Sequence, residues 1–302
     1  MKRTHHIAWM AASAALLVLV AGCGPAETQT LQDQVEETLG GAVASVQQSV
    51  QQSVELAAED WQEDLTFKGV SHELSAAAPI GSAEELHLEN AVGSLELKQG
   101  TSDQLVVKAT VSAADKTSRK AKLEKLFEQS TVSVLNRGGQ VEVLVHAKDE
   151  PNKNLWDWAR KELQFSEFRI DYVVEVPAGI REFDVINHVG NLTASGLEGT
   201  YRLVGDVGSI EVADARIAGK SKIETATGSL NLEILAMETD SLLQAKADVG
   251  SITAVLDPAL DCDLETSSGL GEITGAPKGS SERGGGGPQL SLETSIGSIT
   301  VE

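Results

Sequence analysis

Apolar and polar residues alternate along most of the chain between residues 79 and 302, and this period of two dominates its hydrophobic pattern. The clearest runs are 105–111 and 168–176, in which every second residue is apolar. Such alternation is typical of strands that bury one face. Two segments interrupt it, the Lys-rich 114–129 and the aromatic 148–166, and we expect both to be helical insertions. The pattern predicts an all-β fold for this part of the chain.

A short repeat centred on glycine is superimposed on the alternation. Its copies share the glycine, in most cases a following serine, and a leucine or isoleucine two residues after the glycine. The seven glycines are Gly93, Gly190, Gly208, Gly228, Gly250, Gly271 and Gly297. The residues two positions later are Leu95, Leu192, Ile210, Leu230, Ile252, Ile273 and Ile299. A third insertion, 280–287, lengthens the last interval.

Each copy of the repeat is predicted to be a strand, a tight corner at the glycine, and a second strand. Glycine suits the corner because it adopts positive φ without a Cβ penalty. One copy cannot bury its own apolar face, but stacked copies can. We therefore predict a single-domain β-solenoid over residues 79–302, a β-helix-like stack in which successive repeats hydrogen-bond to one another.

One copy departs from the pattern because it contains two glycines, Gly269 and Gly271. If Gly269 is the corner, Leu270 and Gly271 form an insertion, and Cys262 and Leu264 occupy inward positions. We therefore expect Cys262 to be a buried, unpaired thiol that packs as a small hydrophobic residue. The alternative is a reactive or disulfide-forming cysteine.

The N-terminus has the features of a secretory signal peptide over residues 1–22. Lys2 and Arg3 precede an uncharged apolar run, and small residues lead to Cys23. This ending resembles the bacterial lipobox, which implies lipidation of Cys23. We expect a protein anchored in the cell membrane by its lipid and facing outside the cytoplasm. The alternatives are an ordinary secretory signal and an uncleaved membrane anchor.

Residues 23–78, which we call the stalk, have a different period. Apolar residues recur there at steps of three and four over much of the length, interrupted at Gly40 and Gly41. This spacing predicts a lipid-anchored helical stalk or linker in two pieces. A spacer between membrane and domain is the simplest interpretation, and packing against a partner helix or self-association is the alternative.

Composition excludes several classes of protein. The net charge is −21, which makes nucleic acid a poor partner because phosphate binding depends on clustered Lys and Arg. Two cysteines cannot form a disulfide framework or a four-cysteine zinc site. No recognised enzyme motif occurs, so we assign no catalytic residue, cofactor or metal, and each histidine of the mature chain stands alone in sequence.

Three clusters remain as candidates for binding. Asp261, Asp263 and Glu265 line one strand face, which is either a solvated face or a calcium site. An aromatic cluster contains Trp156, Trp158, Phe165 and Phe168. Its rings either cover an end or face of the sheet or form a patch that binds a partner. In the second case, the patch residues are Trp156, Trp158 and Phe165. The basic residues Lys116, Arg119, Lys120, Lys122 and Lys125 form either a solvated helix face or a contact to lipid headgroups or anionic wall polymers.

The glycine repeats, the element Val176-Pro177-Ala178-Gly179 and the lipoprotein-like leader together resemble the bacterial putative-adhesin β-repeat domains. The resemblance covers residues 84 to 302 and implies an envelope protein, but it carries no established catalytic residues. It suggests a non-catalytic adhesion, scaffolding or envelope-stress interaction role with a protein or cell-wall partner. The alternative is an enzyme or binding protein that acts on cell-wall polysaccharide along the solenoid face.

Overall fold

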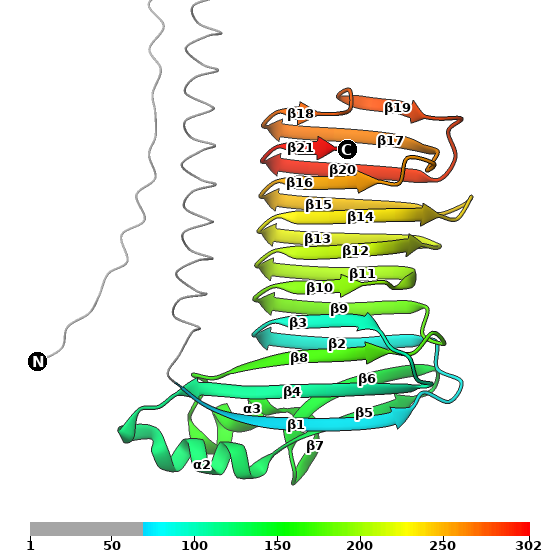
Figure 1. Ribbon diagram of the computed structural model, residues 1–302. Coiled ribbons are helices and arrows are strands. Elements are labelled where there is room, and N and C mark those ends of the chain that lie inside the picture. The colour runs from blue at the N-terminus through cyan, green and yellow to red at the C-terminus, as the bar shows by residue number, and fades with distance from the viewer. Residues whose placement is uncertain (1–68) are drawn as a thin grey trace, which may run out of the picture. The chain divides into compact units, whose positions relative to one another are not determined.

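The computed structural model describes residues 69–302, and most of these residues are in strands. They form twenty-one strands, β1 to β21, and two short α-helices (Figure 1). The predicted signal peptide, Cys23 and the stalk as far as residue 68 lie outside the described residues. Among the described helices, none has the length and apolar character needed to cross a membrane. This part of the chain is therefore mostly β, as its alternating pattern predicts.

The repeats stack through two series of parallel strands (Figure 1). The strands that precede the glycines are, in order of pairing, β2 (Glu85–Val92), β9 (Glu182–Val189), β11 (Glu198–Val207), β13 (Lys220–Thr227), β15 (Leu242–Val249), β20 (Gln289–Ile296) and β17 (Cys262–Leu270). The strands that follow are β3 (Leu95–Gln99), β10 (Leu192–Ser195), β12 (Ile210–Ile217), β14 (Leu230–Met237), β16 (Ile252–Leu256), β21 (Ile299–Val301) and β18 (Ile273–Thr274). Each repeat contributes one strand to each series, and we name it by its glycine.

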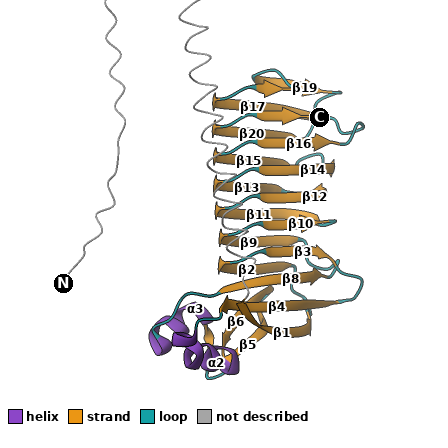
Figure 2. Cartoon of the chain, turned by 60° about the vertical axis from the view of Figure 1, so that its left-hand side comes forward, coloured by secondary structure: helices purple, strands orange, loops and turns teal. Residues whose placement is uncertain are grey.

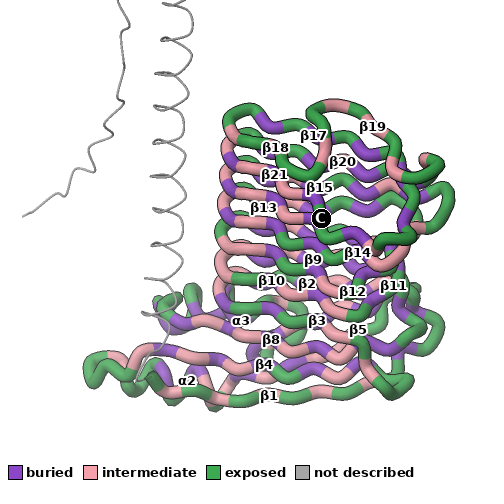
Figure 3. The backbone as a smooth tube through the Cα atoms, turned by 45° about the horizontal axis from the view of Figure 1, so that its top comes forward, coloured by how far each residue is buried: buried purple, intermediate pink, exposed green. Residues whose placement is uncertain are grey.

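Equivalent residues of the repeats lie in register. Leu192 pairs with Leu95 on one side and with Ile210 on the other, so the leucine and isoleucine positions form one buried row. Figure 3 shows the resulting alternation of buried and exposed positions along the strands. Phe183 and Tyr201 are the rings in the strands before the glycines, and they pack together inside at 5.1 Å between ring centroids. The repeat pattern thus determines which side chains form the core.

The order of the stack differs from the order of the sequence at one end only. The Gly93 repeat pairs with the Gly190 repeat, the next one along the chain, although a long excursion separates them. At the other end, the Gly297 repeat lies between the Gly250 and Gly271 repeats. The prediction that each repeat pairs with the next one along the chain is therefore wrong for the Gly250 and Gly271 repeats.

Strand β19 (Gly279–Arg283) explains why the Gly297 repeat lies between the Gly250 and Gly271 repeats. It turns back and pairs antiparallel with β17 over Cys262–Thr266, on the edge opposite β20. Because β19 occupies that edge, the next strand, β20, can pair with β17 only along the opposite edge. There it lies between β17 and β15. The predicted insertion 280–287 is therefore partly a strand, and Gly284–Gly287 form the connection that follows it.

At the other end of the stack the strands are mainly antiparallel. In one layer, β1 (Gly69–Pro79) pairs with β4 (Gln104–Ala114), which pairs with β8 (Arg169–Val176) beside β3. In the other layer, β5 (Ser130–Arg137) pairs with β6 (Gln140–Ala147) beside β2, and β7 (Glu150–Asn154) pairs with the end of β6.

Strand β1 corrects the predicted boundary between stalk and domain. The stalk was expected to extend to residue 78, but the chain is already paired with β4 from Gly69. Val70, Leu74 and Ala76 alternate with exposed residues and pack against the core. This alternation is typical of a strand. The helical prediction for residues 23–78 did not distinguish it from the period of the preceding segment.

The two helical insertions are shorter than expected. Both lie at the end of the stack that contains β1, β5 and β6 (Figure 2). The first contains a short 3-10 turn and α2 (Lys120–Gln129), which buries Leu123 and Leu126. The second begins with β7 and continues through α3 (Leu155–Trp158) into a π-helical turn over Ala159–Leu163. Asn154 caps α3 by accepting a hydrogen bond from the backbone N–H of Asp157.

Candidate functional site

The outward face of β2, β9 and β11 carries the densest group of interacting ionisable side chains on the stack. His87 of β2 and Asp184 of β9 lie 2.7 Å apart between Nδ1 and Oδ2. Arg202 of β11 forms an ion pair with the second carboxylate oxygen of the same aspartate. Asp184 therefore links β9 to both of its neighbouring strands, and its partner in β2 lies 97 residues away in the chain.

A second group lies beside the first on the same three strands. His188 of β9 contacts Asp206 of β11 through Nδ1 at 2.7 Å and Glu89 of β2 through Nε2 at 3.2 Å. The hydrogen bond to Asp206 raises the pKa of His188, with Glu89 adding to the effect and burial opposing it. A protonated His188 can donate from both ring nitrogens, so it holds a positive charge between two carboxylates. We call Glu89, His188 and Asp206 the His188 cluster.

Sequence reasoning did not assign carboxylate partners to these histidines. Each stands alone in the chain, and an isolated strand-face histidine was the expectation. The register of the stack brings them to the aspartates: His188 and Asp206 both lie two residues before a repeat glycine. This shared position relative to the glycine is the sequence signal that could have paired His188 with Asp206.

Five of the seven repeats also contain a buried polar side chain three residues before the glycine. Four of these side chains reach the carbonyl oxygen of the corner glycine in the neighbouring repeat, and the fifth reaches a carbonyl of β8. The hydrogen bonds are Asn187 to Gly93 (3.1 Å), Thr225 to Gly208 (3.0 Å), Thr294 to Gly250 (2.8 Å) and Ser268 to Gly297 (2.9 Å), while Asn90 reaches Ile170 (3.0 Å). Because buried polar atoms need partners, this row links adjacent corners. Sequence reasoning missed it.

The glycines at the predicted corners have positive φ, from 128° at Gly190 to 152° at Gly271. At six of the seven, an added Cβ would lie between 1.8 and 2.2 Å from a carbonyl oxygen of the adjacent strand: Gly93, Gly190, Gly208, Gly228, Gly250 and Gly297. The corners therefore require glycine for two reasons, backbone conformation and the close approach of the next repeat.

The corner of the copy with two glycines is Gly271, and the reading based on Gly269 is wrong. Leu270 pairs with Ile296, which brings Gly271 opposite Gly297, and Gly269 stays within β17. Cys262 nevertheless is fully buried and unpaired, as expected, and Leu264 is buried beside β20. Burial raises the pKa of the Cys262 thiol.

The aromatic residues do not form an exposed patch. Trp156, Trp158 and Phe165 are each at most 9% exposed, so the prediction of a partner patch is wrong for these rings. Trp156 stacks on Phe168 with 3.9 Å between ring centroids, and the insertion packs its rings onto the core. The Trp156 Nε1 has no hydrogen-bond partner among the described residues.

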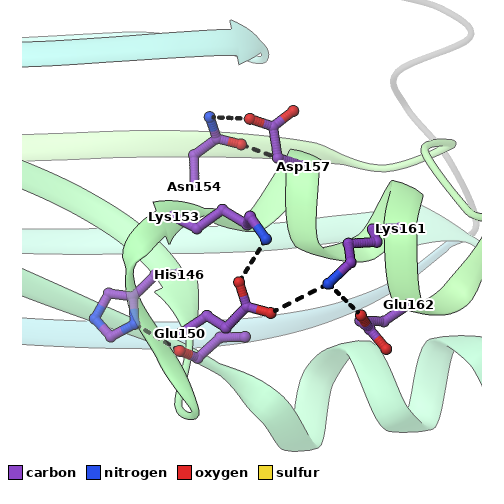
Figure 4. Close-up of polar contacts among 8 residues, drawn as sticks. His146, Glu150, Lys153, Asn154, Asp157, Lys161 and Glu162 are labelled. Atoms are coloured by element: carbon purple, nitrogen blue, oxygen red, sulfur yellow. Dashed lines mark hydrogen bonds and ion pairs between the residues drawn. The ribbon is translucent and has the colours of Figure 1, made fainter.

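Polar contacts around the same insertion hold it together (Figure 4). Lys153 donates to Glu150 at 2.5 Å, and Lys161 lies 4.0 Å from Glu150 and 3.0 Å from Glu162. The hydrogen bond from Lys153 lowers the pKa of Glu150. Because these groups are exposed to solvent, the network orients the segment and contributes little stability.

The buried His146 lies at the junction between β6 and this segment (Figure 4). Its Nε2 is 2.7 Å from Ser133 Oγ, and its Nδ1 is 2.8 Å from the carbonyl oxygen of Ala147. A tautomer with the proton on Nδ1 donates to the carbonyl and accepts from the serine. Both nitrogens are thereby satisfied across a β5–β6 pairing, which accounts for a buried histidine at a strand irregularity.

The remaining charged candidates are distributed along separate elements. Two members of the basic helix face, Lys116 and Arg119, form ion pairs with Glu167. Asp261 and Asp263 lie against the glycine connection, where an added Cβ on Gly284 would be 1.6 Å from Asp261 Oδ1. Among residues 69–302, no group of three or more His, Cys, Asp or Glu side chains is arranged to hold a metal ion.

Comparisons with known proteins find only distant structural likenesses. No family profile and no curated protein sequence matches the chain. A crystal structure described as a "putative cell adhesion protein" of Clostridium sporogenes covers 77% of this chain and 99% of its own, with 12% identity and a TM-score of 0.43. A "putative lipid binding protein" of Parabacteroides distasonis covers 78% of this chain and 98% of its own, with 15% identity and a TM-score of 0.30. A "putative adhesin" of Bacteroides fragilis covers 76% and 97%, with 12% identity and a TM-score of 0.26.

Proposed function

We propose that this chain is a lipid-anchored protein of the cell envelope with a non-catalytic adhesion or scaffolding role, and that its repeats form a β-solenoid. The observation that carries the proposal is the parallel, in-register stack, which repeats equivalent side chains on its outer faces over seven pairs of strands. Such a surface suits contact with an extended or repeating partner. The leader and Cys23 supply the anchor.

The outer face of β12, β14, β16 and β21 is the better candidate for contact. Its in-register row contains Glu211, Asn231, Thr253 and Thr300, and we call it the polar row. These four side chains make no hydrogen bond or ion pair within residues 69–302. On the other outer face, Asp184 and Arg202 and their neighbours are already paired with one another. Unpaired polar groups can hydrogen-bond to a partner without first breaking internal contacts.

The test of the anchor is metabolic labelling with a palmitate analogue in the native host, followed by membrane fractionation. Cys23→Ser should abolish labelling and release the protein from the membrane fraction. Cys262→Ser is the matched control, because its buried thiol should not affect labelling. Labelling that survives Cys23→Ser would refute the anchor.

The test of the contact surface is binding of the purified chain to host cells that lack it and to their isolated walls. Asn231→Arg and Thr253→Arg should reduce binding, because each adds a bulky charge to the polar row. Gln244→Arg, on the outer face of β15, is the matched control and should bind normally. Equal binding by all three variants would contradict the assignment, and release by soluble wall polysaccharide alone would favour a polysaccharide-directed role over a protein partner.

A further inference from the structure

The Gly297 repeat occupies a slot between two repeats that precede it in the sequence. Strand β20 pairs with β15 on one side and with β17 on the other, and β21 pairs with β16 and β18. Backbone bonds close both sides: Gly250 N–H donates to Ile296, and Gly297 N–H donates to Leu270. This repeat is thus held by ladders on both edges.

The contacts inside the slot are also supplied by other repeats. Leu290, Leu292 and Ile299 of this repeat are at most 1% exposed. Leu290 lies between Leu243 and Leu264 of the flanking repeats, and Ile299 lies between Ile252 and Ile273. Thr294 donates to the Gly250 carbonyl, and the Gly297 carbonyl accepts from Ser268. Hence the Gly297 repeat adds one layer of buried side chains and hydrogen bonds between strands that all lie within residues 242–274.

One short connection joins this repeat to the rest of the stack. Strand β19 stays paired with β17, so the link that can redirect the repeat is Gly284–Gly287. Gly284, Gly286 and Gly287 have φ of 64°, 72° and 146°. A run of glycines has a wide range of accessible conformations, so this link can serve as a hinge.

We propose that the slot between the Gly250 and Gly271 repeats is a strand-acceptor site that takes residues 289–301 from a second copy of the chain. The incoming segment would form the same ladders and bury the same side chains as it does within one chain, so only the hinge changes conformation. Reciprocal exchange between two copies gives a closed dimer without any new interface. The occupant is a second copy, because its residues 289–301 can form every pairing with β15, β16, β17 and β18 that the same residues form within one chain.

Exchange competes with insertion within the same chain. The tether gives the intramolecular insertion a high effective concentration, so the exchanged form should increase with total protein concentration. Confinement of many copies on one surface would favour it, a consequence that rests on the proposed anchor. Exchange itself does not depend on the anchor and can be tested without it.

Engineered thiols test the proposal directly. Gln244 and Ser291 pair across β15 and β20 on the outward face, and directly paired residues of adjacent strands are about 5 Å apart, within disulfide range. In a background of Cys23→Ser and Cys262→Ala, a Gln244→Cys chain and a Ser291→Cys chain are unfolded, mixed, refolded together and oxidised. A covalent heterodimer is expected, in a yield that rises roughly in proportion to concentration.

The matched control mixes Lys222→Cys and Gln244→Cys chains. These positions pair across β13 and β15 with the same geometry, but neither belongs to the exchanged repeat. The proposal requires several-fold more covalent dimer in the first mixture than in the control. Equal yields, or only monomers at every concentration, would overturn it. A single chain with both Gln244→Cys and Ser291→Cys should close its own disulfide and remain monomeric.

Discussion

The side-chain amide of Asn187 donates a hydrogen bond to the carbonyl oxygen of Gly93 at 3.1 Å, although 94 residues separate the two in the chain. The same amide also donates to the carbonyl of Asn191 at 3.1 Å. Asn187 is fully buried, so no water competes for these carbonyls. The contact joins the Gly93 repeat to the Gly190 repeat across the long excursion that separates them in the chain.

Replacing this amide should measurably destabilise the protein. Asn187→Ala removes the side-chain donor of the Gly93 carbonyl and a partner of Asn90, and it leaves the Asn191 carbonyl with the Leu95 N–H as donor. Loss of a buried hydrogen-bond partner costs about 1 to 3 kcal/mol. Denaturant unfolding should therefore show a lower midpoint with little change in slope. Asn231→Ala, on the outer face, should change the free energy of unfolding by less than about 0.5 kcal/mol; equal effects would contradict the role given to the buried row.

A corner glycine should tolerate no side chain. Gly228 has φ of 146°, and an added Cβ would lie 2.0 Å from the Gly208 carbonyl oxygen. Gly228→Ala should cost at least about 3 kcal/mol, because backbone strain and displacement of the next repeat add together. Thermal unfolding measures the loss.

The turn glycine Gly138 separates these two causes. It has φ of 65°, and nothing lies within 4 Å of an added Cβ. Gly138→Ala therefore tests strain alone and should cost about 1 kcal/mol. If both variants lose the same stability, the close approach of the repeats is not what demands glycine at the corners.

The His188 cluster should make stability depend on pH. The folded state raises the pKa of His188 above its ordinary value of 6.5, chiefly through Asp206. Its stabilisation is complete below about pH 6.5 and is lost as the pH rises through the raised pKa. Because the imidazole is 40% exposed, solvent screening should limit the effect to less than about 1 kcal/mol. Unfolding measured at about pH 6 and about pH 9 tests the direction.

Variants of the cluster should remove that contribution. His188→Gln and Asp206→Asn each remove the charge pair between these two residues. Each should therefore reduce the dependence over this window, His188→Gln more strongly because Glu89 still faces the histidine in the other variant, and salt should reduce it in the parent protein. An unchanged pH dependence in both variants would assign it to other groups.

The Cys262 thiol should react slowly in the native protein. It is fully buried, and burial raises its pKa, so both access and thiolate formation are disfavoured. Labelling by a thiol reagent should therefore proceed at the rate of local or global opening and accelerate in denaturant. Val207→Cys, at a position that is 46% exposed, provides a fast-reacting comparison in the same chain. Similar rates at the two sites would contradict the burial of Cys262.

The local part of this architecture could be read from the sequence. Alternation identified the inward residues of β4 and β8, and the glycine repeat identified the corners, because both depend on the period of a strand and on the φ of one residue. The aromatic insertion was located but its rings were misjudged: Trp156 and Phe165 are buried against Phe168, which no local pattern reveals. The partners of His87 and His188 likewise could not be predicted from the sequence, because the stacking of the repeats determines which residues of neighbouring strands lie side by side.

By itself, the sequence determined the strand period, the glycine corners, the buried leucine and isoleucine row and the burial of Cys262. Only the tertiary structure decided the order of the repeats and the partners of each outward side chain. The physical reason is that every repeat carries the same rows, so any copy fits against any other with equal register. What breaks this equivalence is nonlocal: β8 returns beside β3, and β19 covers the outer edge of β17 and forces the Gly297 repeat between its predecessors.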